Sequence, residues 1–273
     1  SLCDWSSDVC SSDLQILFED NHLLVINKQA GLPTMGTDSG PTVHSLAAQY
    51  IKHSCGKPGR VFLGIVSRLD AMTSGVLVLA RTSKAASRLA AQFASKSLPT
   101  SPANRPKKKK GAVKAPRKIY LAIAQGAVDT EAAQWSDLIY KDESAHRMRL
   151  SPEPHPEAQH AALRYQRIAE PGSDSIHAVE LITGRKHQIR TQFADRGHPI
   201  LGDRKYGSKR SFDSGIALHS WRLQIEHPTK RVPMWFEAPL PSSWSKFQTA
   251  MPTPSALRSQ IESCFPPPSP EPD

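Results

Sequence analysis

Two separate stretches of the sequence carry side chains that could do chemistry. The first runs from Val66 to Gly75 and reads VSRLDAMTSG, so one acid, Asp70, stands between an Arg-Leu pair and a Thr-Ser-Gly turn signal. The second runs from Leu181 to Arg190 and reads LITGRKHQIR, with several cations and no acid. Cations stabilise the ionised form of a carboxylate that acts as a nucleophile or charge stabiliser. A lone loop aspartate more often only caps a turn, and the cationic stretch is what favours the catalytic interpretation.

Together, the two stretches resemble motifs of the RluA-type pseudouridine synthases. That family has an Arg-Leu-Asp motif with Thr-Ser-Gly three residues after the Asp, and further on Gly-Arg-x-His-Gln-x-Arg. Both motifs are present here in the same order, and the resemblance extends from about Gln15 to about Trp244. It implies an enzyme that breaks the N-glycosidic bond of a uridine in RNA, turns the base and rejoins it through carbon. The reaction of the family needs no metal and no nucleotide cofactor.

The resemblance also implies roles for three residues. Asp70 corresponds to the catalytic carboxylate, Arg185 to its basic partner, and Tyr120 to an aromatic ring against the extracted base. Alternatives remain for two of them, because Arg185 also suits a phosphate clamp and a strand tyrosine is ordinarily a core residue. Whether Asp70 attacks the sugar, attacks the base or removes a sugar proton stays open.

Further basic and polar side chains are expected to contact the RNA. They are Arg68, Lys28, His187, Gln188, Arg190, Lys107, Lys108, Lys109 and Lys110. The three motif residues among them begin a predicted helix, where backbone N–H groups favour phosphate. Lys28 fits a solvated lysine at the end of a strand as well as it fits an RNA contact. The four-lysine run likewise fits a solvated spacer nearly as well as an RNA-binding segment. The sequence departs from the family at Gln29, where the family has Pro, and at Ser67, where it more often has His.

Hydrophobic periodicity predicts the elements that must position these residues. Short apolar runs rich in Val and Ile predict strands at residues 16–20, 23–28, 76–80, 117–124, 161–169, 176–182 and 216–226. Helical spacing predicts helices over 42–53, 83–97 and 186–196, with Thr42 and Ser83 as the first two caps. We therefore expect an α+β fold with a mixed, largely antiparallel sheet flanked by helices, as in the family.

Composition shifts predict four regions. Residues 1–14 repeat Ser-Ser-Asp without a helical or strand period, and they read as a non-native or disordered leader. A catalytic domain is expected over 15–247, interrupted by a disordered basic insertion at 98–116, and a Pro-rich tail over 248–273. Since the resemblance begins at Gln15, no separate N-terminal RNA-binding domain is expected.

The formal net charge of +10 is concentrated in one segment. Residues 95–118 hold nine of the 35 Lys and Arg residues and no acid, which leaves 26 basic against 25 acidic residues elsewhere. The partner predicted from this segment is structured RNA, ribosomal or transfer. Neither a membrane-spanning run nor a signal peptide is visible, and Cys3, Cys10, Cys55 and Cys264 show no zinc or disulfide spacing. We expect a cytoplasmic monomer without a metal or other cofactor.

Two other functions fit the sequence less well than a pseudouridine synthase does. A catalytically silent RNA-binding protein would tolerate loss of an acid in an electropositive cleft, so the intact Asp70 argues against it. A glycosidase acting on other nucleosides would ordinarily need two carboxylates. No second acid accompanies Asp70 in these motifs.

Overall fold

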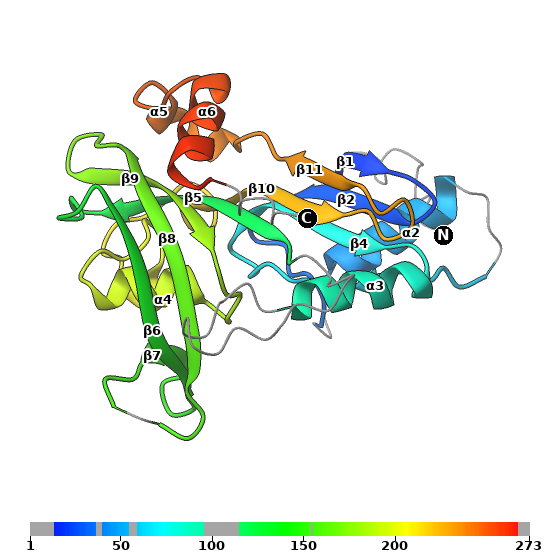
Figure 1. Ribbon diagram of the computed structural model, residues 1–273, viewed down its shortest axis with the longest axis horizontal. Coiled ribbons are helices and arrows are strands. Elements are labelled where there is room, and N and C mark those ends of the chain that lie inside the picture. Colours follow the sequence, from blue (N-terminus) through cyan, green and yellow to red (C-terminus); the bar gives the residue numbers. More distant parts are fainter. Residues whose placement is uncertain (1–13, 37–39, 55–58, 96–114, 154, 267–273) are drawn as a thin grey trace, which may run out of the picture. The chain divides into compact units, whose positions relative to one another are not determined.

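A computed structural model describes residues 14–36, 40–54, 59–95, 115–153 and 155–266 (Figure 1). The chain divides into two compact units, one comprising Ser1–Pro116 with Ser220–Leu240 and the other Arg117–His219 with Pro241–Asp273. Each unit is built on antiparallel strands accompanied by helices, which confirms the predicted α+β fold class. None of the helices in the described ranges is long and apolar enough to span a membrane.

The sheet of the first unit has the strand order β1-β2-β4-β10, with β3 also paired to β4 and β11 to β10. Its strands are β1 (Gln15–Glu19), β2 (Leu23–Lys28), β3 (Gly64–Ile65), β4 (Ser74–Ala80), β10 (Leu218–Glu226) and β11 (Pro233–Glu237). Helices α2 (Val43–Ser54) and α3 (Ser83–Ala94) belong to the same unit. Sequence analysis predicted all of these elements except the two short strands β3 and β11.

The central strands β2 and β4 are buried on both faces, because successive side chains of a strand point to opposite sides. Leu23 and Val25 belong to a core cluster with Ala85 and Leu89 of α3. Leu24 belongs instead to a second cluster with side chains of α2. A helix therefore covers each face, which explains why these strands read as continuous apolar runs rather than as alternating ones.

Side-chain caps fix where the two helices begin. The Thr42 hydroxyl accepts the backbone N–H of Ser45 at 3.1 Å, and the Ser45 hydroxyl accepts the backbone N–H of Thr42 at 2.9 Å. This reciprocal pair confirms the predicted cap of α2. The cap predicted for α3 is wrong by one residue, because Thr82 rather than Ser83 accepts the N–H of Ala85. A capping residue needs extended backbone dihedrals, which Thr82 has.

Gly75 makes the bend into β4 that the sequence predicted. Its φ is +112°, a conformation that side chains disfavour. A Cβ at this position would lie 2.2 Å from the backbone oxygen of Ser220 on the neighbouring strand β10. Only glycine therefore lets the backbone of β4 approach β10 at the point where the Asp70 loop ends.

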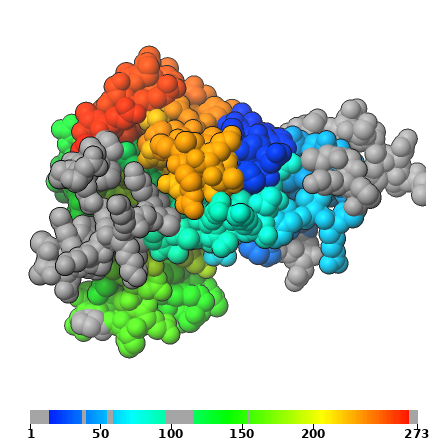
Figure 2. All heavy atoms as spheres, turned by 45° about the vertical axis from the view of Figure 1, so that its right-hand side comes forward, coloured from blue at the N-terminus to red at the C-terminus, as the bar shows by residue number. Residues whose placement is uncertain are grey.

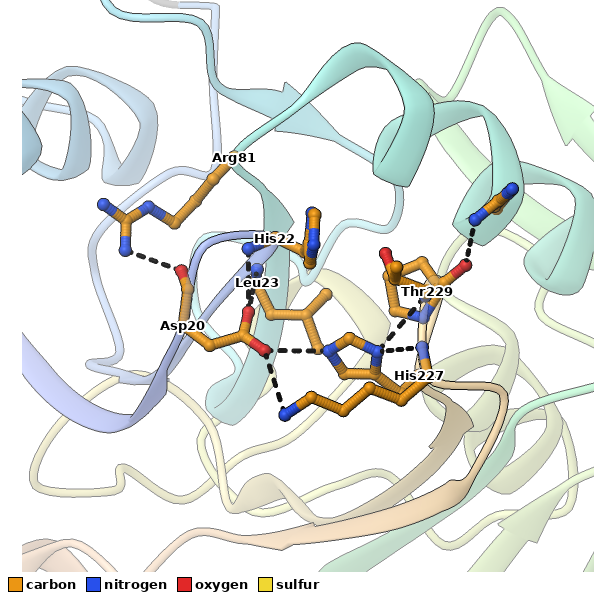
Figure 3. Close-up of polar contacts among 9 residues, drawn as sticks. Asp20, His22, Leu23, Arg81, His227 and Thr229 are labelled. Atoms are coloured by element: carbon orange, nitrogen blue, oxygen red, sulfur yellow. Dashed lines mark hydrogen bonds and ion pairs between the residues drawn. The ribbon is translucent and has the colours of Figure 1, made fainter.

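A polar cluster joins the β1–β2 turn to the β10–β11 turn (Figure 3). One carboxylate oxygen of Asp20 accepts the backbone N–H groups of His22 and Leu23, each at 2.8 Å, and the other accepts Nε2–H of His227 at 2.8 Å. Nδ1 of His227 accepts the backbone N–H of Thr229 and Lys230, which fixes the tautomer. Burial alone would raise the pKa of Asp20, but these hydrogen bonds together hold it below its usual value.

The hairpin formed by β10 and β11 completes the first unit. In the space-filling view, its orange surface adjoins both the blue surface of β1 and the teal surface of α3 (Figure 2). Phe236 of β11 packs against Phe18 of β1 with ring centroids 5.5 Å apart, and it belongs to the same core cluster as Leu89 of α3. The last residue of the predicted leader, Leu14, is also buried in this unit.

The second unit has the antiparallel strand order β5-β9-β8-β6-β7. The strands are β5 (Arg117–Gln125), β6 (Ala132–Asp142), β7 (Arg147–Leu150), β8 (Gln159–Ala169) and β9 (Asp174–Leu181). The helical segments are α4 (Gln188–Asp195), η2 (Arg204–Tyr206), η3 (Ser242–Trp244), α5 (Ser245–Gln248) and α6 (Pro254–Cys264). Phe193 of α4 packs against Trp135 of β6 and Tyr165 of β8, with centroids 4.8 and 5.8 Å away.

Residues 254–264 correct the prediction of a Pro-rich tail from residue 248 onward. They form α6, whose Leu257 and Ile261 are buried. Thr253 caps this helix by accepting the N–H of Ala256, and Pro254 occupies the first turn, where its missing N–H costs nothing. The flanking prolines that suggested a tail therefore begin and follow a helix.

Candidate active site

Asp70 lies half-buried on the loop that leads into β4, and this loop is anchored by the segment after β2. The backbone oxygen of Asp70 accepts the N–H of Thr73 at 3.0 Å, which closes a turn. The backbone oxygen of Ala71 accepts the N–H of Gly31 at 2.8 Å, and that of Leu69 accepts the Thr34 hydroxyl at 2.9 Å. Residues on both sides of Asp70 are thus fixed, so the carboxylate is held on a constrained backbone.

The Lys28 side chain is the third anchor of this loop. It is 1% exposed, and its Nζ donates to the backbone oxygens of Gln29, Leu32 and Ala71 at 2.8, 2.8 and 2.9 Å. Burial lowers the pKa of Lys28 to about 7, while the negative charge of Asp70 acts in the opposite direction. Both interpretations given for Lys28 are therefore wrong, because an ammonium with three carbonyl acceptors inside the protein contacts neither RNA phosphate nor bulk water.

Arg68 lies on the same loop and is exposed. Next to it is a cavity of about 690 Å³, whose wall includes Ser67, His44 and Met35. Every residue of this wall belongs to the first unit. Arg68 is therefore placed where an RNA strand that reaches Asp70 would meet a positive charge.

In the second unit, the turn after β9 presents Arg185. The side-chain oxygen of Gln188 accepts the backbone N–H of Arg185 at 3.0 Å and the Thr183 hydroxyl at 2.8 Å, and its Nε2 donates to the oxygen of Ala162 at 3.0 Å. Nε of Arg185 donates to the backbone oxygen of His160 at 2.9 Å. Gln188 thus shapes the turn that carries Arg185, and its 2% exposure corrects the prediction that it contacts RNA.

His187 precedes α4 in a left-handed conformation, with φ of +52°. Its Nδ1 lies 2.8 Å from the hydroxyl of Tyr206, which also accepts the backbone N–H of Met148 at 3.1 Å. Burial raises the pKa of Tyr206, so the phenol stays protonated and keeps the imidazole in one orientation.

Arg190 is part of a buried ion pair. Its Nε and Nη2 donate to the two carboxylate oxygens of Asp203 at 2.6 and 2.9 Å, and the side chains are 6% and 1% exposed. The guanidinium also stacks over Tyr206, 4.9 Å from the ring centroid. Two-pronged pairing of this kind satisfies the guanidinium inside the protein. The prediction that Arg190 contacts RNA is therefore wrong, and its role in this unit is structural.

Tyr120 lies on β5, opposite Val179 of β9, and is 9% exposed. Lys118 is two residues earlier and so faces the same side of the strand. A Cβ on Gly184 would lie 3.0 Å from Nζ of Lys118, and burial lowers the pKa of this lysine. The Lys118 side chain thus brings the strand of Tyr120 against the turn of Arg185, a contact between two motifs that sequence reasoning missed. The sequence signal for this contact is the two-residue spacing of Lys118 and Tyr120, which places both side chains on one face of the strand.

The remaining predictions concern residues in different units or outside the described ranges. Asp70 belongs to the first unit, whereas Tyr120 and Arg185 belong to the second, and the meeting of the three in one cleft stays a prediction. The run Lys107 to Lys110 lies outside the described residues. Within the described ranges, no group of three or more His, Cys, Asp or Glu side chains is placed to hold a metal ion.

Comparisons with known proteins show the family of the chain. Residues 22–195 match the family model described as RNA pseudouridylate synthase. The chain is 34% identical over 233 residues to the Uncharacterized RNA pseudouridine synthase YhcT of Bacillus subtilis (strain 168), covering 84% of this chain and 70% of that protein. It is 32% identical over 246 residues to the Ribosomal large subunit pseudouridine synthase D of Zymomonas mobilis, covering 84% and 69%.

Solved structures show the same fold. The human RNA Pseudouridylate Synthase Domain Containing 1 protein has a TM-score of 0.69 at 20% identity, over 93% of this chain and 96% of that chain. The corresponding human Domain Containing 4 protein has a TM-score of 0.66 at 22% identity, over 86% and 93%. The fold is therefore that of the pseudouridylate synthases. The chain belongs to the RluA-type RNA pseudouridine synthases, enzymes that isomerise uridine in RNA.

Proposed function

We propose that the chain converts specific uridines of ribosomal or transfer RNA to pseudouridine, with Asp70 as the catalytic carboxylate. The anchoring of the Asp70 loop carries this assignment, because side chains and backbone from residues 28–34 fix the carbonyls of Leu69 and Ala71 on both sides of the acid. A reacting group gains most when its position is fixed before the substrate arrives.

Other residues take supporting roles in the proposal. Arg185 pairs with Asp70 and orients it, and Tyr120 offers an aromatic face to the extracted base. Arg68 and His187 contact the RNA, and Lys107 to Lys110 attract it by charge. These residues act within one catalytic domain, expected over 15–247, in a cytoplasmic monomer without a cofactor.

The RNA class is supported by the name of one relative, which specifies the large ribosomal subunit. The deciding experiment maps pseudouridine in ribosomal and transfer RNA from cells with and without the gene, and again after complementation with the Asp70→Asn variant. We expect one or a few uridines to lose the modification and to regain it only with the unaltered chain. An identical map in cells without the gene would refute the proposal.

A further inference from the structure

The cavity beside Arg68 has a wall of mixed chemistry. Met35, Leu63 and Ile65 form an apolar part, and His44, Ser67 and Arg68 form a polar part. Among the described residues that line the cavity, none is a carboxylate. Within the described part of the chain, neither the Ser67 hydroxyl nor the Arg68 guanidinium has a hydrogen-bond or ion-pair partner. An apolar wall with unused polar groups and a cation fits a flat, uncharged heterocycle attached to a negatively charged backbone.

The first amide groups of α2, which follow the lining residue Thr42, offer no anion site at this end of the cavity. The N–H groups of Val43 and His44, at the start of α2, donate to the backbone oxygens of Pro33 and Thr34 at 2.9 and 3.2 Å. These amides are therefore occupied and do not form an anion site. Arg68 remains as the cation that meets the backbone.

His44 supplies a hydrogen-bond acceptor to the same wall. Its Nε2 lies 3.2 Å from the backbone oxygen of Leu63, and because a carbonyl only accepts, Nε2 carries the proton. In this tautomer Nδ1 is an acceptor. Ring N–H groups and exocyclic amines of nucleobases are donors that such a nitrogen recognises.

We propose that this cavity binds an unpaired nucleobase of the substrate RNA that neighbours the target uridine. The proposal rests on the proposed function, in which Asp70 acts on that uridine. Arg68 is two residues before Asp70, a separation that a chain spans with at most about 7 Å. One RNA strand therefore reaches both the cavity and the acid, and the cavity selects the neighbour of the uridine rather than the uridine itself.

The test measures binding without turnover, by fluorescence anisotropy on two probes. One probe is a short oligouridine, and the other is the same ribose-phosphate chain without bases. Ser67→Phe fills the cavity and Met35→Ala removes part of its apolar wall, while Ser87→Phe places the same ring at an exposed position of α3. Base contacts of this kind are expected to change the affinity for oligouridine about fivefold or more.

We expect Ser67→Phe and Met35→Ala to weaken binding of oligouridine and to leave binding of the base-free chain unchanged, and Ser87→Phe to change neither. Equal losses on both probes would make the cavity a phosphate site, and unchanged affinities would remove it from RNA binding; either result overturns the proposal. Met35 is 49% exposed, so Met35→Ala is expected to fold. If Ser67→Phe fails to fold, the affinities of Met35→Ala for the two probes test the proposal. Failure of the proposed function would appear instead as an identical pseudouridine map in cells with and without the gene.

Discussion

The ammonium of Lys28 donates to the backbone oxygen of Ala71, the residue directly after Asp70, at 2.9 Å. In register, Lys28 lies opposite Gly75, where the Asp70 loop enters β4. One buried lysine therefore holds the far end of the loop, and the negative charge of Asp70 acts to raise its pKa against the effect of burial. The position of the acid thus depends on a lysine whose ammonium is enclosed by backbone oxygens.

Asp70→Asn is expected to abolish pseudouridine formation while leaving the fold intact. The amide has the shape of the carboxylate but lacks the charge that the reaction needs. Turnover of substrate RNA should fall below about one per cent of the unaltered enzyme, with the same thermal midpoint. Turnover above that level would exclude Asp70 as the catalytic acid.

Arg185→Met is expected to lower turnover by about tenfold or more, since a charge-assisted contact contributes about 1.5–3 kcal/mol. The matched control is Lys186→Met, which removes an exposed charge from the next residue. Partial rescue by Arg185→Lys would support a charge pair with Asp70. If Arg185→Met and its control have the same activity, Arg185 is not the partner of Asp70.

Lys28→Met is expected to destabilise the chain by about 3 kcal/mol, because three backbone oxygens lose their donor inside the protein. Lys52→Met, an exposed change on α2, is the control. The pKa of Lys28 is about 7 in the folded chain and 10.5 in the unfolded chain, so unfolding takes up a proton between these values. The free energy of unfolding of the unaltered chain should therefore rise with pH across this window, by at most about 1.4 kcal/mol per pH unit.

Lys28→Met lacks this contribution, so its deficit relative to the unaltered chain should widen from pH 7 toward pH 10. Urea unfolding at several pH values measures the difference. A deficit that narrows over the same range would mean that the folded chain raises the pKa of Lys28, contrary to its burial.

Arg190→Met is expected to cost about 3–5 kcal/mol of unfolding free energy, because it leaves the carboxylate of Asp203 buried without a partner. Replacing both residues, as in Arg190→Met with Asp203→Leu, should recover part of that loss. RNA affinity of the folded variant should stay unchanged. A stable variant with weakened RNA binding would instead restore Arg190 to the RNA-binding surface.

Replacing Lys107 to Lys110 with Ser should weaken RNA binding in general and flatten its dependence on salt. Each lost phosphate contact lowers the log–log slope by about 0.7 for single strands, so up to about three units disappear. Turnover on saturating RNA should barely change. The control removes exposed lysines elsewhere, through Lys52→Ser and Lys84→Ser. An unchanged slope would identify the run as a solvated spacer.

The sequence was sufficient for the apolar strands and for the bend at Gly75, because an apolar run and a glycine report local requirements. It did not predict β3, β6, β7 or β11, which are short or carry many exposed side chains. Lys28 could not be understood in the same way. Its acceptor on Ala71 lies 43 residues further along the chain, and only the folded loop shows that the ammonium is enclosed. Likewise, nothing near Arg190 in the sequence marked Asp203 as its partner. Hydrophobic periodicity predicts strands and helices, but it does not predict which distant polar groups pair in the folded chain.

The first unit is discontinuous, and this has a consequence for its synthesis. The ribosome completes β1, β2, β4, α2 and α3 before it makes any residue of the second unit. The core around Val25 and Val78 also needs Leu223 and Phe236, which emerge only after that entire unit. The early segment therefore keeps apolar surface exposed while most of the chain is still being translated. This interval is when chaperones and proteases have access to the strands that flank the Asp70 loop.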